Sequence, residues 1–257
     1  MDLNKVLYIS QEITPYLAAD ALSSFGRDLP QSIQETGVEV RTFMPRYGAI
    51  NERRNQLHEV IRLSGLNIVI NDTDHPLIIK VATLQPSRMQ VYFIDNDDYF
   101  RRHASELETV SDPGENDERT IFFVRGVLET ARKLRWLPSV IHCTGWISAL
   151  APLYLKKIYA EDPAFSNARI VFSLYKQDFP EPFAPQFVDK LVEDGINRED
   201  LVALGDGAVG MTELCRLAID HADAVAISSE DVDPALIEYA RATGKPLLEY
   251  PGDTAYA

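Results

Sequence analysis

The sequence predicts an α/β fold: a single Rossmann-like, mostly parallel doubly wound sheet with a β-hairpin insertion. Apolar runs of strand length alternate with segments of helical periodicity along most of the 257 residues. This alternation is typical of parallel strands joined by crossover helices. Residues 5–9, 22–36 and 38–43 form a first β-α-β unit. Residues from about 57 to 95 read as extended strands joined by short turns, which predicts a β-rich insertion or an antiparallel edge. No linker divides the chain, so residues 1–257 are expected to form one domain.

In the first half of the chain, turn and cap residues set the expected limits of the elements. Gly37 is suited to end the first helix, and Pro30 is expected to kink or split it. Asn116 is expected to cap a long helix at 117–134. Its buried face would carry Ile121, Val124, Leu128 and Ala131. The other expected elements are strands at 57–70, 76–84 and 89–95, a short helix capped by residues 95–98, and an acidic loop at 106–115.

The centre of the chain is the segment 140–155, where Val140 and Ile141 read as a buried strand. Residues 142–145 are expected to form a tight polar turn, and Trp146 to begin a helix. Such a turn at a strand end is where open α/β sheets bind ligands. The elements expected after it are a strand at 168–174, a proline-rich loop at 179–185, a glycine-rich loop at 205–210, a helix at 211–221, a strand at 222–227, a helix at 233–243 and a strand at 246–250.

Composition limits the classes of partner. A formal net charge of -14 argues against nucleic acid or an anionic membrane as the main partner. Two cysteines suggest no disulfide framework, and no apolar run is long enough to span a bilayer. The first residues carry no basic-then-apolar signal segment. We therefore expect a cytoplasmic protein.

Few residues point to chemistry by themselves. His142 is either the edge of a ligand pocket or a histidine hydrogen-bonded in the core, and Cys143 is best read as a small buried residue. Residues 205–210, G-D-G-A-V-G, resemble a phosphate-binding loop, but no strand precedes them, which favours a plain glycine-rich loop. The carboxylates near strand ends and helix starts are usually caps; they are Asp95, Asp97, Asp98 and Asp117. No metal site is expected, because the histidines lack ligand spacing; the others are His58, His75, His103 and His221.

Several segments, in this order, resemble the N-terminal domain of bacterial glycogen synthases and plant starch synthases. They are K-V-L-Y-I-S-Q-E-I-T-P-Y from residue 5, R-T-F-M-P-R-Y-G from 41, V-Y-F-I-D-N from 91, N-D-E-R-T-I-F-F from 116, V-I-H-C-T-G-W from 140 and A-D-A-V-A-I-S-S from 222. The resemblance implies half of a two-domain GT-B glycosyltransferase, which transfers glucose from ADP- or UDP-glucose to an α-1,4-glucan without a bound metal or other cofactor. By the same resemblance the binding residues would be Glu12, Tyr16, Asp95, Asn96, Asp117, Arg119, His142, Trp146 and Arg216.

The sequence departs from this family where the chemistry is done. The family's Lys-x-Gly-Gly-Leu donor loop reads Ala18-Ala19-Asp20-Ala21-Leu22, which loses a cation and gains an acid. The histidine that is thought to contact the reacting sugar is Ile147, which can neither donate a hydrogen bond nor transfer a proton. The Thr-x-His-Asn segment is lost at residues 173–176, and Arg216 replaces a lysine. No catalytic residue is therefore assigned.

These observations leave three hypotheses. The first is a catalytically degenerate relative that binds a glucan or a sugar nucleotide, or serves as a partner subunit. The second is an active glucosyltransferase half that pairs with a separate chain resembling the C-terminal domain, which we expect this sequence to lack. The third is a non-catalytic interaction module. The loop at 18–22 is expected not to hold phosphate, and Ile147 is expected to point into the site.

Overall fold

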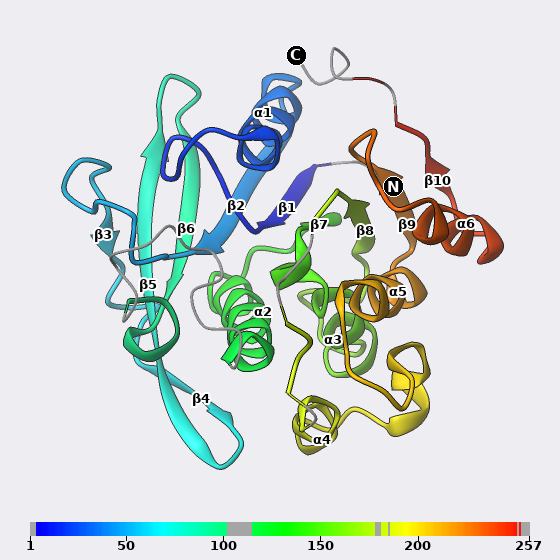
Figure 1. The fold of residues 1–257 in the computed structure, drawn as a ribbon. Coiled ribbons are helices and arrows are strands. Elements are labelled where there is room, and N and C mark those ends of the chain that lie inside the picture. The colour runs from blue at the N-terminus through cyan, green and yellow to red at the C-terminus, as the bar shows by residue number, and fades with distance from the viewer. Residues whose placement is uncertain (1–3, 102–114, 178–180, 185, 251, 253–257) are drawn as a thin grey trace.

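The central sheet reverses its strand order in the middle, between β1 and β7 (Figure 1). The computed structural model describes residues 4–101, 115–177, 181–184, 186–250 and 252. Its ten strands follow the order β10-β9-β8-β7-β1-β2-β6-β5-β3, with β4 paired to β5. All pairs from β10 to β6 are parallel. These strands are β1 Lys5–Ser10, β2 Glu39–Pro45, β6 Met89–Asp95, β7 Val140–Thr144, β8 Arg169–Leu174, β9 Ala224–Ile227 and β10 Leu247–Leu248. The predicted fold class, a mostly parallel α/β sheet, is confirmed.

The β-rich segment forms one antiparallel edge of this sheet. It consists of β3 His58–Glu59, β4 Leu66–Ile70 and β5 Thr73–Leu84, whereas β6 is a full member of the parallel sheet. The single strand expected at residues 57–70 is wrong, because a turn separates β3 from β4. Leu63 is buried within that turn, and Gly65 has a φ of 84°, which favours glycine.

Figure 1 shows α1 on one side of the sheet and α2, α3 and α5 on the other. The helices are α1 Ala21–Glu35, α2 Asn116–Lys133, α3 Ala151–Lys157, α4 Phe187–Glu193, α5 Met211–His221 and α6 Pro234–Ala242. Shorter helical turns are the π-helix η1 Asp97–Arg101 and the 3-10 helices η3 Trp146–Ser148 and η4 Arg198–Leu204. The predicted inner face of α2 is confirmed, since each of its four residues is at most 1% exposed.

Two expectations about the helices are corrected. Helix α1 is not split at Pro30: it continues as one element, with Pro30 buried on its inner face, so packing against the sheet outweighs the lost hydrogen bond. Asn116 does not cap α2: it is the first residue of the helix, and its side-chain oxygen accepts from Arg119 instead. The acidic loop at 106–114 and residues 179, 180 and 185 of the proline-rich loop lie outside the described residues.

The turn expected at 142–145 is also wrong, because β7 runs on through His142, Cys143 and Thr144. The actual turn is Gly145, whose φ is 90°. A Cβ atom there would lie 2.5 Å from the Gln11 side chain, so both the conformation and the space require glycine. The helix expected from Trp146 begins as η3, and α3 follows at Ala151.

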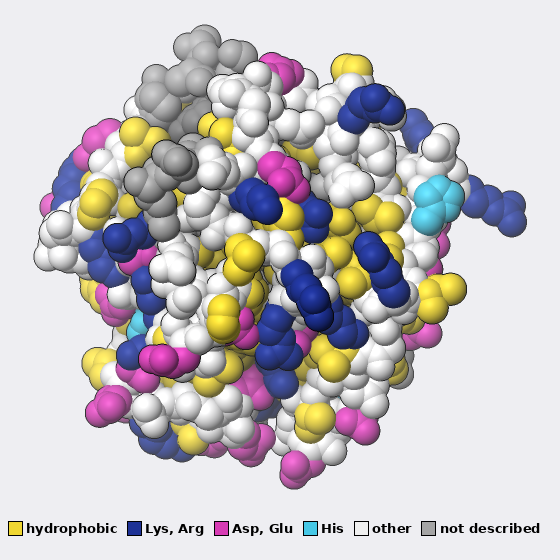
Figure 2. Space-filling model, turned by 180° about the vertical axis from the view of Figure 1, so that it is seen from behind, with side chains coloured by type: hydrophobic (Ala, Val, Ile, Leu, Met, Phe, Trp, Pro, Cys, Tyr) yellow, Lys and Arg dark blue, Asp and Glu magenta, His cyan; other side chains and the backbone are white. Residues whose placement is uncertain are grey.

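The face of the molecule seen in Figure 2 is not uniformly acidic. On the face seen in Figure 2, Lys and Arg side chains lie among the acidic ones, although the whole chain carries a net charge of -14. Among the helices of the described residues, none is long and apolar enough to cross a membrane.

Candidate functional site

The carboxyl ends of the parallel strands meet at one edge of the sheet, next to the point where the strand order reverses. Ligands of open α/β sheets bind at such an edge. Here the chain leaves β1 as a long loop, held to its neighbour by a hydrogen bond from the Gln11 amide to the Thr144 carbonyl oxygen. The loop after β2 lies beside it, held by the Arg46 amide on the Ile94 carbonyl oxygen.

A pocket of about 570 Å³ opens between these two loops. It contains Glu12 and Tyr16, two of the residues predicted for binding. Asp20 and Arg54 also reach it, so the charged side chains among its described lining residues are two acids and one cation. The remaining lining residues are Pro15, Leu17, Ala18 and Ala49.

Close packing of α1 fixes the position of Glu12. Gly26 of this helix lies so near that an added Cβ would be 2.2 Å from the Glu12 carbonyl oxygen. The Glu12 carboxylate accepts a hydrogen bond of 3.1 Å from the Gln11 side chain and remains half-buried. A partly desolvated carboxylate held in this way is a strong acceptor for a ligand hydroxyl.

Tyr16 forms a wall of the same pocket. Its ring meets Phe93 edge-on at 4.9 Å, and only 6% of the residue is exposed. Burial raises the pKa of Tyr16 to about 12, so the hydroxyl stays protonated and can donate a hydrogen bond at neutral pH.

The loop that precedes α1 supplies a carboxylate that caps the N-terminus of the helix. Asp20 is the N-cap: it accepts from the Ser23 amide at 2.7 Å, and the Ser23 hydroxyl accepts from the Asp20 amide at 3.0 Å. A free helix N-terminus attracts phosphate, because its amides point outward and carry partial positive charge. Here one of those amides is taken, and a negative charge lies where a phosphate would bind.

The predicted residue Asp95 lies beneath the surface in a charge network. It is fully buried and forms an ion pair of 3.1 Å with Lys80, which also contacts Glu52 at 2.5 Å. Arg46 meets the same Glu52 oxygen at 2.5 Å. Partial burial opposes ionisation of Glu52, but the hydrogen bond from Lys80 and the charge of Arg46 lower its pKa overall. This network ties the loop after β2 to β5 and β6, which supports the pocket from below.

Asn96 serves the backbone. Its side-chain oxygen accepts from the amides of Asp98 and Tyr99, and its side-chain nitrogen donates to the Pro76 carbonyl oxygen at 2.9 Å. Asn96 therefore caps η1, and it belongs to the segment 95–98 that was expected to cap a short helix.

The predicted residues Asp117 and Arg119 are likewise buried, at the start of α2. Asp117 forms a 2.7 Å ion pair with Lys190 of α4. Arg119 donates to the Tyr99 carbonyl oxygen at 2.8 Å and to the side chains of Asn116 and Glu115. These bonds join α2 to η1 and α4.

The buried hydroxyl of Tyr47 is influenced by the charge of Arg119 in this buried group and by the charge of Glu12 in the pocket. Burial raises the pKa of its hydroxyl, the charge of Glu12 raises it further, and the charge of Arg119 lowers it. Both charges therefore act on this one hydroxyl, which has no hydrogen-bond partner among the described residues. Sequence reasoning missed Tyr47, although it belongs to the quoted P-R-Y-G segment.

His142 lies in the core, in line with the second of the two interpretations drawn from the sequence. Its Nε2 atom is 2.7 Å from the Ser173 hydroxyl, and its ring lies 5.1 Å from the Tyr8 ring. Burial lowers the pKa of His142 to about 4, so the imidazole is neutral at pH 7. Its position in mid-strand, rather than at a strand end, explains this burial.

Trp146 and Ile147 are inside the protein. Trp146 is 1% exposed and packs against Phe183 at 6.1 Å, and its amide donates to the Gln177 side chain. Ile147 has no exposed surface, so the expectation that it points into the site is wrong: its side chain fills the core behind the edge of the sheet.

The remaining candidates lie apart from the pocket. Arg216 of α5 stacks over Tyr239 of α6 at 5.2 Å. The glycine-rich loop at 205–210 follows η4 and not a strand, as the sequence indicated, so it lacks the setting of a dinucleotide fingerprint. Both cysteines are buried and free, and burial raises the pKa of Cys215 to about 12. Within the described ranges, no three His, Cys, Asp or Glu side chains are placed to share a metal ion.

Comparison with known proteins agrees with this architecture. Residues 5–239 match the family model described as the starch synthase catalytic domain. The chain is 39% identical over 195 residues to a glycogen synthase of Chlorobium chlorochromatii, an alignment that covers 75% of this chain and 40% of that protein. It is 34% identical over 235 residues to a glycogen synthase of Chlorobium phaeobacteroides, covering 88% and 48%. The chain thus spans about half the length of these relatives, or less.

A solved structure shares the fold. The catalytic domain of starch synthase IV from Arabidopsis thaliana, bound to ADP and acarbose, superposes with a TM-score of 0.77 at 17% identity. The superposition covers 97% of this chain and 51% of that one. At this level of identity the likeness establishes the fold alone.

Proposed function

The chain belongs to the starch synthase catalytic domain family, and we propose that it is a catalytically degenerate member that binds α-1,4-glucan without transferring glucose to it. In this proposal the glucan occupies the pocket between the loops after β1 and β2. A donor sugar nucleotide has lost the contacts that would hold its phosphates.

The observation that carries this proposal is that the Asp20 carboxylate caps the N-terminus of α1. A nucleotide diphosphate would meet this carboxylate, with Glu12 in the same pocket, and among the described residues the only cation lining that pocket is the exposed Arg54. Close contact between like charges is unfavourable, and a surface arginine compensates only partly.

The groups that would act on a reacting sugar support the same conclusion. His142 is neutral and already bonded to Ser173, and Ile147 has no group that can exchange a proton. Glucan binding, in contrast, needs a hydroxyl acceptor and a donor beside a wall of low polarity. Glu12 and Tyr16 supply these at the open end of the pocket.

Two measurements test the proposal. Purified protein is incubated with glycogen and labelled ADP-glucose or UDP-glucose, and we expect no label in the polymer. Calorimetric titration with maltotriose should then show binding that Glu12→Gln weakens by about 10-fold, because a hydrogen bond to a charged group contributes about 1.5–3 kcal/mol. Glu35→Gln, an exposed change at the far end of α1, is the matched control and should leave binding unchanged. Incorporated label, or maltotriose binding that is indifferent to Glu12, contradicts the proposal.

A second candidate function is an active glucosyltransferase half that pairs with a separate donor-binding chain. It is favoured by one observation, that Arg54 reaches the pocket and offers a cation to a phosphate. Under this alternative, label should enter glycogen only when a protein with the donor domain is added, and Arg54→Gln should abolish the transfer. If the mixture stays inactive, this candidate is rejected.

A further inference from the structure

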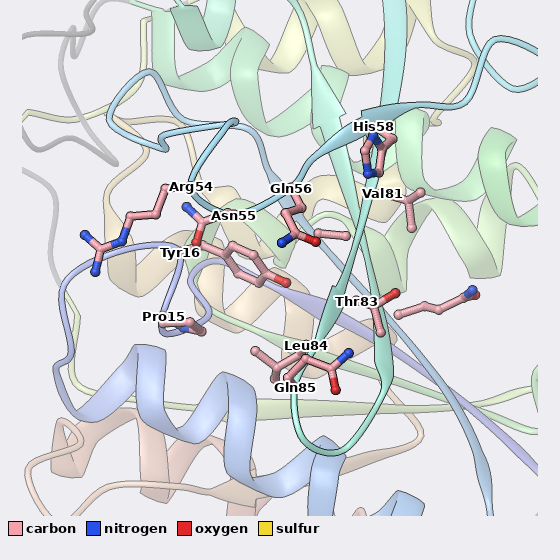
Figure 3. Close-up of a pocket in the computed structure, with 12 residues that line it drawn as sticks. Pro15, Tyr16, Arg54, Asn55, Gln56, His58, Val81, Thr83, Leu84 and Gln85 are labelled. Carbon is pink, nitrogen blue, oxygen red and sulfur yellow. The ribbon is translucent and has the colours of Figure 1, made fainter.

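A second pocket, of about 370 Å³, adjoins the first (Figure 3). It runs between the loop at residues 54–58 and the outer strand β5. The two pockets share three lining residues, Pro15, Tyr16 and Arg54, so they lie side by side. The other lining residues of the second pocket are Asn55, Gln56, His58, Val81, Ala82, Thr83, Leu84, Gln85 and Gln90.

The lining of the second pocket differs from the rest of the molecule in charge. The chain contains 39 Asp and Glu residues, but none is among the described residues that line this pocket. Four of its side chains are carboxamides and one is a threonine. A carboxamide both donates and accepts hydrogen bonds, as a sugar hydroxyl does, so this lining suits an uncharged polyhydroxylated ligand.

Several of these polar groups are free to bind. Gln56, Thr83 and Gln85 are exposed, and their side chains make no hydrogen bond to another described residue. The backbone at Gln56 has a φ of 53°, a conformation that costs free energy for a residue other than glycine. Figure 3 shows the Gln56 carboxamide beside the Tyr16 ring, on the side of the loop that faces β5.

Tyr16 joins the two pockets. Its ring lies between the loop at residues 54–56 and β5, and its hydroxyl points toward the strand (Figure 3). The same side chain is a wall of the first pocket. A chain of sugar units that leaves the first pocket past Tyr16 would therefore enter the second.

We propose that the second pocket extends the glucan site, so that one linear α-glucan lies along both pockets and the protein prefers long chains to short ones. This inference rests on the proposed function, because it takes the ligand of the first pocket to be a glucan. An anionic ligand fits less well, since the cationic side chain and the histidine among the described lining residues, Arg54 and His58, are both exposed.

The test compares maltotriose with maltoheptaose by calorimetry on the whole chain. The wild type should bind maltoheptaose about 10-fold more tightly, or more, if two or three additional hydrogen bonds form. Thr83→Val keeps a β-branched residue on the strand, and Gln56→Gly suits the positive φ. Each should weaken maltoheptaose binding by about five-fold, the effect of one neutral hydrogen bond, and leave maltotriose binding unchanged.

Matched controls lie at the other end of β5. Thr73→Val and Asn71→Gly repeat the same changes at an exposed strand threonine and at a residue with a φ of 50°. Both should leave binding of either sugar unchanged. Equal affinity for the two sugars would overturn this inference, as would maltoheptaose binding that Thr83→Val and Gln56→Gly do not affect. In either case, maltotriose binding that depends on Glu12 would still support the proposed function. If the wild type binds neither sugar, both fail together.

Discussion

Replacing Gly26 with alanine tests how α1 holds the candidate site. The added Cβ would lie 2.2 Å from the Glu12 carbonyl oxygen, whereas real Cβ contacts are essentially never closer than 3.0 Å. Backbone must therefore move by at least the difference, 3.0 minus 2.2 or 0.8 Å. Overpacking costs about 1–3 kcal/mol, and the better helix propensity of alanine returns about 1 kcal/mol. Because the contact is with backbone, we expect the upper end and a net loss of about 2 kcal/mol.

The assay is thermal unfolding followed by circular dichroism, with maltotriose titration of the folded variant. A net loss of about 2 kcal/mol lowers Tm by roughly 4–8 °C in a chain of this size. Maltotriose binding should weaken as well, since Glu12 is displaced. Gly126→Ala in α2 is the matched control, because its Cβ would meet only the side-chain tips of Ile94 and Leu77 at 3.0 Å. If Gly26→Ala unfolds at or above the wild-type Tm, or no lower than Gly126→Ala, the argument from close packing is refuted.

Two further predictions concern buried charge. His142 has a folded pKa of about 4 against about 6.5 unfolded, so the unfolded state binds the extra proton between these values and stability falls as the pH drops from 6.5 to 4. The loss approaches about 3 kcal/mol near pH 4 and is about 2 kcal/mol at pH 5. His142→Gln should remove most of the loss when urea unfolding at pH 7.5 and pH 5 is compared; an equal loss in the variant would contradict the assignment. Lys80→Met removes the ion pair between Lys80 and the buried carboxylate of Asp95 and should cost about 3 kcal/mol in urea unfolding at pH 7. The exposed Arg53→Met should stay within about 0.5 kcal/mol of wild type, and a similar small effect for Lys80 would show that the network is dispensable.

The fold was predictable because its signals are local. Strand β1 and helices α2 and α5 are each indicated by the pattern of apolar residues within a single segment. Glu12 and Tyr16 were proposed from the family resemblance, and they lie in one pocket because both belong to the loop after β1.

The charge networks could not be foreseen, because their members are distant in sequence. Lys80 meets Asp95 from the neighbouring strand, and Lys190 meets Asp117 across 73 residues. No spacing rule links such pairs, so the sequence indicated caps for Asp95 and Asp117, and the resemblance indicated binding, but neither predicted their ion pairs. His142 was misplaced because a polar side chain was taken as the end of a strand, whereas Ser173 on β8 satisfies it within the sheet.

The outer strands of the sheet have a consequence for how the molecules behave toward one another. A long unpaired edge strand is a template on which another chain can add a strand, and this leads to aggregation. In the described sheet both outermost strands, β10 and β3, are two residues long. The longer β4 is protected differently: Arg125 donates to the Val69 carbonyl oxygen at 2.7 Å and occupies part of its outer hydrogen-bonding row. The described sheet thus ends in a two-residue strand at each edge, an arrangement that disfavours strand addition by a neighbouring molecule.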